Sequence, residues 1–134
     1  IPVIRWIDDK QENRERPIIY INYEALHDQY DHPTSSMHKA YEALLDNYQV
    51  YIVATAPDYD VKETEKVRAW IEEYLSAPAY HHTIFTHRKS VLYGDYFIDP
   101  DPDENFMGTN LKYGSDEFKT WDEIITYFSR LGGQ

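Results

Sequence analysis

Residues 18–53 have the sequence IIYINYEALHDQYDHPTSSMHKAYEALLDNYQVYIV, in which two short apolar runs enclose an amphipathic segment. The runs, 18–21 and 50–53, are rich in β-branched and aromatic residues, which is typical of strands buried in a sheet. Between the runs, apolar residues recur at helical spacing at Ala40, Tyr41, Leu44, Leu45 and Tyr48. We expect Thr34 or Ser35 to cap this helix. The stretch therefore predicts a strand–helix–strand unit.

The alternation of strands and helices continues along the chain. Asp60 and Glu63 have capping-box spacing before a second amphipathic helix. Three further strands are predicted at residues 83–86, 96–98 and 111–113. Thr120 and Glu123 form a second capping box, which opens a last helix that ends at Gly132-Gly133.

Strands that alternate with helices favour a mostly parallel sheet with helices on both faces. The predicted fold class is therefore α/β, a three-layer fold in which about five strands are flanked by helices. Residues 17–134 are expected to form this domain. The charged segment 1–16 is interpreted as a tail or an extra strand, and the sequence does not decide between the two.

Composition excludes several classes of function. The chain has 134 residues, 13 Lys plus Arg and 24 Asp plus Glu, giving a formal net charge of −11. Such a surface repels the phosphates of nucleic acids and anionic lipids, so we expect neither as a partner. The absence of cysteine excludes disulfides and thiol catalysis. No apolar run approaches the roughly 20 residues that span a bilayer, and we expect a cytoplasmic protein.

In a parallel sheet, ligands bind beyond the carboxyl ends of the strands. The residues to consider are therefore those that follow each predicted strand, at 22–24, 54–56, 87–89 and 99–101.

One of these segments carries a family resemblance. Residues 86–99, THRKSVLYGDYFID, resemble the third and fourth motifs of 5′(3′)-deoxyribonucleotidase-like proteins of the haloacid dehalogenase-like (HAD) superfamily. Residues 50–57, VYIVATAP, resemble the second motif, a strand that ends in Thr or Ser. The resemblance extends from about residue 16 to residue 128 and implies a HAD-like, Rossmannoid fold.

The resemblance places the first catalytic motif at residues 21–26, where the family carries Asp-x-Asp. In the family, the first Asp is the nucleophile and holds magnesium, and the second is the general acid and base. Here these positions are Asn22 and Glu24. A neutral amide has no anionic oxygen for attack or for metal binding. Glu24 keeps the carboxyl group but is one methylene longer, which is enough to misplace a proton donor.

Of the remaining motif positions, some carry the family's residue and one does not. The family ends the fourth motif with two acidic residues, of which the second is a magnesium ligand. Asp99 matches the first of these, Pro100 occupies the second, and Asp101 is a weaker substitute one residue further on. Thr55 and Lys89 match the positions that bind the transferred phosphoryl group. Lys89 is equally compatible with an ion pair that neutralises nearby aspartates.

The family's nucleotidases insert a helical cap between the first two motifs. Asn22 and Thr55 are only 33 positions apart, and the predicted helix uses many of these residues. We therefore expect a capless domain with an open site and no nucleoside pocket.

Two hypotheses of function follow. The first is a catalytically degenerate, non-enzymatic binding or regulatory domain, with a protein or a phosphate-containing small molecule as ligand and no cofactor. The alternative is a Mg²⁺-dependent phosphohydrolase of phosphate monoesters that uses the carboxylates of Glu24, Asp99 and Asp101 in displaced roles. The losses at Asn22 and Pro100 favour the first hypothesis.

Overall fold

The computed structural model describes residues 16–55 and 61–131. The elements in chain order are β1 (Ile18–Asn22), the 3₁₀ helix η1 (Tyr23–Ala25), α2 (Met37–Leu45), β2 (Gln49–Thr55), α3 (Val61–Tyr74), α4 (Ala77–His81), β3 (Thr83–Thr86), the 3₁₀ helix η2 (Lys89–Val91), β4 (Tyr96–Asp99), β5 (Thr109–Lys112) and α5 (Trp121–Arg130). The predicted tail, except Arg16, lies outside the described residues, as do Asp60 and Gly132-Gly133.

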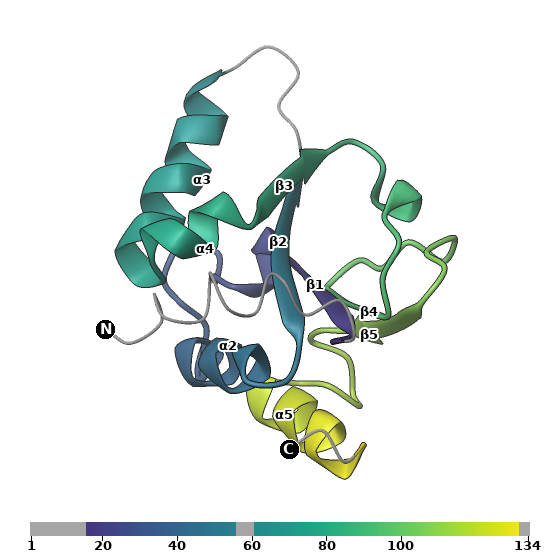
Figure 1. Ribbon diagram of the computed structural model, residues 1–134. Coiled ribbons are helices and arrows are strands. Elements are labelled where there is room, and N and C mark those ends of the chain that lie inside the picture. Colours follow the sequence, from purple (N-terminus) through teal and green to yellow (C-terminus); the bar gives the residue numbers. More distant parts are fainter. Residues whose placement is uncertain (1–15, 56–60, 132–134) are drawn as a thin grey trace.

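The five strands form one parallel sheet in the order β3-β2-β1-β4-β5, with β1 at its centre (Figure 1). In the register, Ile21 of β1 lies between Ile52 of β2 and Ile98 of β4. The predicted fold class is confirmed, and all five predicted strands are present. None of the helices in residues 16–55 and 61–131 has the length and apolar character that a bilayer crossing requires.

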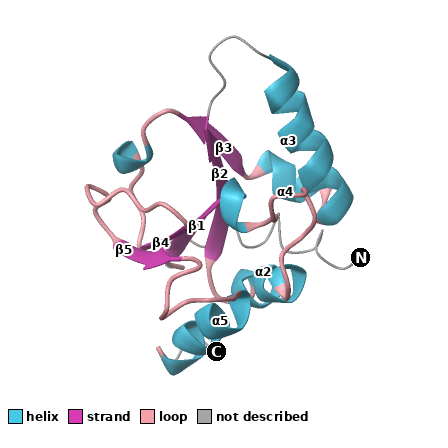
Figure 2. Cartoon of the chain, turned by 180° about the vertical axis from the view of Figure 1, so that it is seen from behind, coloured by secondary structure: helices cyan, strands magenta, loops and turns pink. Residues whose placement is uncertain are grey.

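One face of the sheet is covered by α-helices. Figure 2 shows this arrangement with the molecule turned by 180° from the view of Figure 1. Because side chains alternate along a strand, this face carries Ile19, Ile52 and Ile98, all buried. Residues of α2, α3, α4 and α5 complete the same apolar cluster. One of the two tryptophans among them, Trp121 at the start of α5, is 1% exposed. We call this side the helical face.

The opposite face carries a smaller cluster, and loops cover it. Tyr20, Val53 and Phe97 of the strands pack there with Phe106. Phe106 belongs to the β4–β5 connection, and the half-buried Leu92, which also packs there, belongs to the β3–β4 connection. We call this side the loop-covered face. The sequence predicts α-helices on both faces, but here the described connections contain only η2, because they are short and interrupted by glycines and prolines.

The helix starts agree with the sequence in one case and differ in another. The capping box of Thr120 and Glu123 at α5 is confirmed. The predicted cap of the first helix by Thr34 or Ser35 is wrong, since α2 begins after Ser36, which has a left-handed backbone and no side-chain cap. The Thr34 hydroxyl instead donates to the carbonyl oxygens of Ala25 and Leu26. The side chain that local spacing assigned to the helix cap is therefore used in a tertiary contact.

Candidate functional site

The candidate residues lie at the carboxyl edge of the sheet. Asn22 ends β1, Thr55 ends β2 and Asp99 ends β4. By the alternation of side chains, these three residues point to the loop-covered face. Asn22 pairs in register with Val53, and Asp99 follows Ile98, the β4 partner of Ile21. The fold thus brings Asn22 and Asp99 onto adjacent strands at one edge.

Lys89 and Asp99 form a short ion pair at this edge. The Lys89 ammonium donates to Oδ2 of Asp99 at 2.6 Å and to the carbonyl oxygen of Asp101 at 2.7 Å. The other carboxylate oxygen of Asp99 accepts from the backbone N–H of Asp101 at 2.9 Å. Asp99 is 1% exposed, and a buried charge requires such partners. Of the two roles that the sequence allows for Lys89, the ion pair is present.

Asn22 is also engaged. Its side-chain oxygen accepts a hydrogen bond from the backbone N–H of Glu24 at 2.7 Å, which caps η1. Asn22 is buried, whereas the Glu24 side chain is 68% exposed. The Glu24 carboxylate lies 3.8 Å from Nε2 of His27. Within the described residues, no ion pair joins Glu24 to Lys89.

Thr55 is exposed at the end of β2 and pairs in register with Thr86 of β3. The residues that follow it, 56–60, lie outside the described part of the chain. The position of Thr55 at the edge is consistent with the predicted phosphate-binding role, which stays a prediction.

The Mg²⁺ ion that the family resemblance implies does not fit the side chains described here. Mg²⁺ requires oxygen ligands, usually carboxylates, in near-octahedral geometry. The Asn22 oxygen and both Asp99 oxygens already accept hydrogen bonds, and Pro100 offers no side-chain ligand. Among residues 16–55 and 61–131, no group of three or more His, Asp or Glu side chains is placed to hold a metal ion.

Sequence reasoning missed a second group of residues beside the edge. Tyr23 follows Asn22, and its ring lies 4.5 Å from that of His27 and 5.6 Å from that of Trp70. Burial raises the pKa of Tyr23, and the charges of Asp31, Glu24 and Glu63 raise it further. The Trp70 indole N–H donates to the carbonyl oxygen of Asp31 at 2.7 Å. These contacts fix the loop after η1 against α3.

The pairing of this loop with α3 had no usable signal in the sequence. His27 and Trp70 are 43 positions apart. His27 is typical of a polar loop and Trp70 of the apolar side of a helix, so neither residue by itself indicates a contact with the other. His27 also lies close to Asp31, at 3.8 Å between its ring nitrogen Nδ1 and the carboxylate oxygen, and both residues belong to the loop that follows η1. His81 is the last residue of α4, and the adjacent His82 is its C-cap.

Comparisons with known proteins identify relatives of the chain. No protein-family model matches it. A protein of Vibrio phage KVP40, named "Putative 5'(3')-deoxyribonucleotidase", is 36% identical over 94 residues, which cover 67% of this chain and 55% of the relative. The chain is a relative of the 5′(3′)-deoxyribonucleotidases. Proteins of the same name from Staphylococcus aureus (strain Mu50) and Staphylococcus epidermidis are 29% and 25% identical over 96 and 99 residues.

These alignments cover 63% and 66% of the deoxyribonucleotidase-like chain and 53% and 55% of the two staphylococcal proteins. The chain spans about half the length of the curated relatives that it matches. The family resemblance inferred from residues 50–57 and 86–99 is therefore confirmed, and the parallel sheet is consistent with a HAD-like domain.

Proposed function

We propose that this chain is a catalytically degenerate deoxyribonucleotidase-like domain that binds a phosphate-containing ligand without hydrolysing it. The observation that carries the proposal is that Asn22 stands at the nucleophile position and is already hydrogen-bonded. The residue at the nucleophile position is an amide whose oxygen caps Glu24 at 2.7 Å. A nucleophile for phosphorus needs a free anionic oxygen, and Asn22 offers neither the charge nor a free position.

The state of Asp99 supports the same proposal. Its two oxygens are held by the Lys89 ammonium and the Asp101 N–H. A buried carboxylate with both oxygens engaged is a structural ion pair, and releasing it to a metal would leave Lys89 without its counter-ion. The hydrogen bonds of Asp99 thus support a structural role for this carboxylate at the edge of the sheet.

The ligand class follows from the residues that remain exposed at this edge. Lys89 is partly exposed, at 25% of its side chain, and Thr55 is exposed at the end of the neighbouring strand. A cation and a hydroxyl at the carboxyl edge of a parallel sheet suit an anionic oxygen ligand such as phosphate. Between β1 and β2 the chain contains only η1, a loop and α2, so the ligand would meet an open surface. A cytoplasmic location is part of this proposal.

The alternative is a Mg²⁺-dependent phosphohydrolase, and the names of the relatives favour it. In that case Glu24 would supply the free carboxylate, since its side chain is 68% exposed. The arrangement in which Asp99 is bound to Lys89 would then have to open before a metal could bind.

Activity on an aryl phosphate with Mg²⁺ separates the two functions. The native chain is compared with a restored variant that combines Asn22→Asp, Glu24→Asp and Pro100→Asp. We expect no turnover by the native chain and measurable turnover by the restored one, because nucleophile, acid and metal carboxylate are then all present. Mg²⁺-dependent turnover by the native chain that Glu24→Ala abolishes would replace this proposal with the alternative.

Binding of inorganic phosphate tests the ligand class directly. We expect Lys89→Met to weaken binding measured by calorimetry, and Lys39→Met, which removes an exposed lysine of α2, to leave it unchanged. Far-ultraviolet circular dichroism of both variants confirms that the fold is retained. Equal affinity in the two variants would contradict a phosphate site at Lys89.

A further inference from the structure

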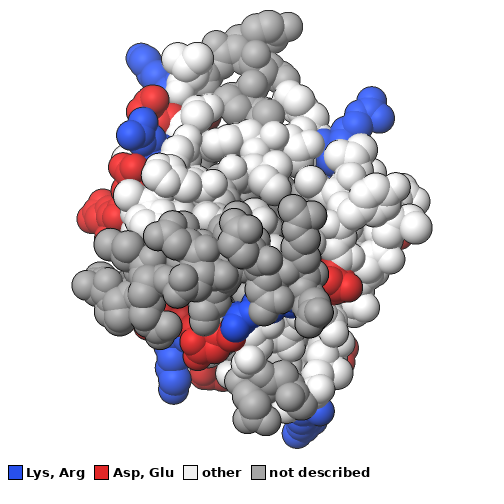
Figure 3. Space-filling model, viewed as in Figure 1, with Lys and Arg blue, Asp and Glu red and all other residues white. Residues whose placement is uncertain are grey.

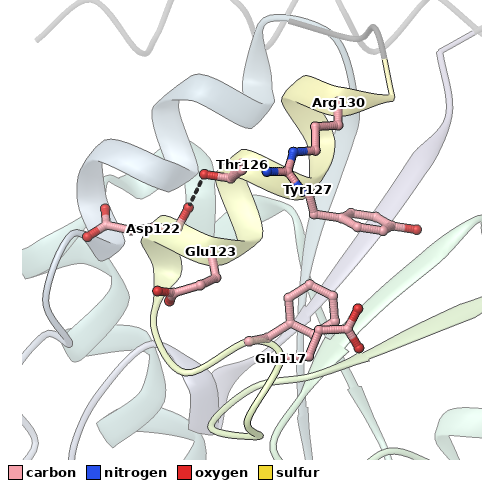
Figure 4. A pocket seen from close by; sticks show the side chains of 7 residues that line it. Glu117, Asp122, Glu123, Thr126, Tyr127 and Arg130 are labelled. Atoms are coloured by element: carbon pink, nitrogen blue, oxygen red, sulfur yellow. Dashed lines mark hydrogen bonds between the residues drawn. The ribbon is translucent and has the colours of Figure 1, made fainter.

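A groove of about 300 Å³ lies beside α5, which Figure 1 shows below the sheet. Its lining comes from α5 and from the segment before it. Figure 4 shows the residues that form it: Glu117, Phe118, Asp122, Glu123, Thr126, Tyr127 and Arg130. A second hollow of about 210 Å³ lies between α5 and α2 and shares Asp122 and Thr126 with the first. The exposed side of α5 is therefore concave on both flanks.

The groove has an aromatic floor. The rings of Phe118 and Tyr127 meet edge to face with centroids 5.6 Å apart. Phe118 is 7% exposed, and Tyr127 is half-buried against the helical face of the core. Such a floor offers apolar surface for an aliphatic chain, and the partly exposed ring of Tyr127 offers a face for a cation.

The charges around this floor are mostly negative. Glu117, Asp122 and Glu123 supply three carboxylates, and Arg130 is the one cation among the lining residues. The Glu123 carboxylate accepts from the backbone N–H of Thr120 at 2.8 Å and also from its hydroxyl. These hydrogen bonds lower the pKa of Glu123, so its negative charge persists into mildly acidic solution.

We propose that this groove docks an arginine side chain of a basic protein partner. The guanidinium suits both parts of the lining, since it stacks on aromatic rings and pairs with carboxylates in a planar geometry. The volume of the groove is at the lower end of the range for ligand pockets, which suits one long side chain. The formal net charge of −11 steers a basic partner towards the molecule and disfavours a second copy of this chain.

This docking surface does not depend on the proposed phosphate site. Figure 1 places α5 at the bottom and the carboxyl ends of β2 and β3 at the top. None of Asn22, Thr55, Lys89 or Asp99 lines the groove. Failure of phosphate binding and failure of peptide binding are therefore separate results.

The test uses a nine-residue peptide that alternates arginine and leucine, titrated into the ¹⁵N-labelled chain. We expect the largest amide shift changes at residues 117–130. Glu117→Lys is compared with Glu104→Lys, because both replace an exposed glutamate and change the net charge equally. Glu117→Lys should weaken binding about two- to fivefold beyond the effect of Glu104→Lys, the range expected for one exposed ion pair.

Three results would overturn the proposal. The first is equal weakening by the two variants, which would show that the peptide responds to net charge alone. The second is shift changes located away from α5. The third is the absence of binding at about 1 mM peptide, an affinity that corresponds to only about 4 kcal/mol. Both variants keep the native lining aromatic residues, and their spectra report directly whether they remain folded.

Discussion

The helical face of the sheet carries Ile19, Ile52 and Ile98 under four α-helices, whereas the loop-covered face carries Tyr20, Val53 and Phe97 under two connections. Among residues 16–55 and 61–131, the first face packs 25 buried residues into one cluster, and the second packs four. This difference between the two clusters indicates that the helical face supplies most of the buried apolar area, and therefore most of the stability. Figure 3 shows where the charged side chains lie on the surface in the view of Figure 1.

The candidate site belongs to the face with less packing. Asn22, Thr55 and Asp99 point to the loop-covered side, and Lys89 comes from η2 in one of its connections. Loops positioned by a rigid scaffold commonly carry binding residues. In this chain the main apolar scaffold and the candidate site therefore occupy opposite sides of a single sheet.

The largest expected effect on stability comes from creating a cavity in the core of each face. Trp121→Ala should lower the free energy of unfolding by about 3–5 kcal/mol, because it empties a site that is 1% exposed and removes hydrogen bonds to Ala25 and Thr34. Phe106→Ala should cost about 3 kcal/mol, at the low end of the same range, since a loop can relax into the space. Urea unfolding followed by circular dichroism measures both. A larger loss for Phe106→Ala would reverse the comparison.

An intermediate effect tests how closely the loops pack. A Cβ atom on Gly108 would lie 2.5 Å from the carbonyl oxygen of Gly94 and 2.7 Å from that of Asp95. Gly108→Ala should therefore cost about 1–3 kcal/mol through overpacking. Gly114→Ala is the control, with φ +89° and open space around it, and should cost about 1 kcal/mol through backbone strain alone. Thermal unfolding compares the variants, and a Gly108→Ala chain as stable as the native one would show that the two connections are loosely packed.

The smallest effect concerns one hydroxyl on each face. Tyr20 donates to the carbonyl oxygen of Tyr93 at 2.6 Å, so Tyr20→Phe should cost about 1 kcal/mol. The Tyr41 hydroxyl is buried on the helical face and has no hydrogen-bond partner in the described structure. Tyr41→Phe should leave stability unchanged or raise it by up to about 1 kcal/mol. Urea midpoints of the pair measure this contrast, and destabilisation by Tyr41→Phe would reveal a partner for that hydroxyl.

The elements were largely predictable from the sequence because their signals are local. The β-branched runs at 18–21 and 50–53 lie within β1 and β2. The capping box of Thr120 and Glu123 opens α5 as expected, because both residues belong to one turn. The short α4 was missed, since Ala77–His81 contains a proline and too few residues for a helical period.

The candidate site was predictable in position but not in contacts. The family resemblance indicated Asn22, Lys89 and Asp99, and parallel pairing brings strand ends to one edge. It did not indicate that Lys89 reaches both Asp99 and the Asp101 carbonyl. These hydrogen bonds of Lys89 depend on how η2 and the β4–β5 connection fold over the sheet.

The order of the strands and of the longer helices, the acidic composition, the absence of cysteine and the family resemblance can all be derived from the sequence alone, because each is a property of composition or of neighbouring residues. The fold itself adds which face the helices cover, that Thr34 contacts Ala25 and Trp121 without capping α2, and that the Asn22 amide caps η1. These features could not be derived from local sequence because polar groups compete for hydrogen-bond partners. A polar side chain forms the hydrogen bond that the whole fold makes available, and segments distant in sequence set that choice.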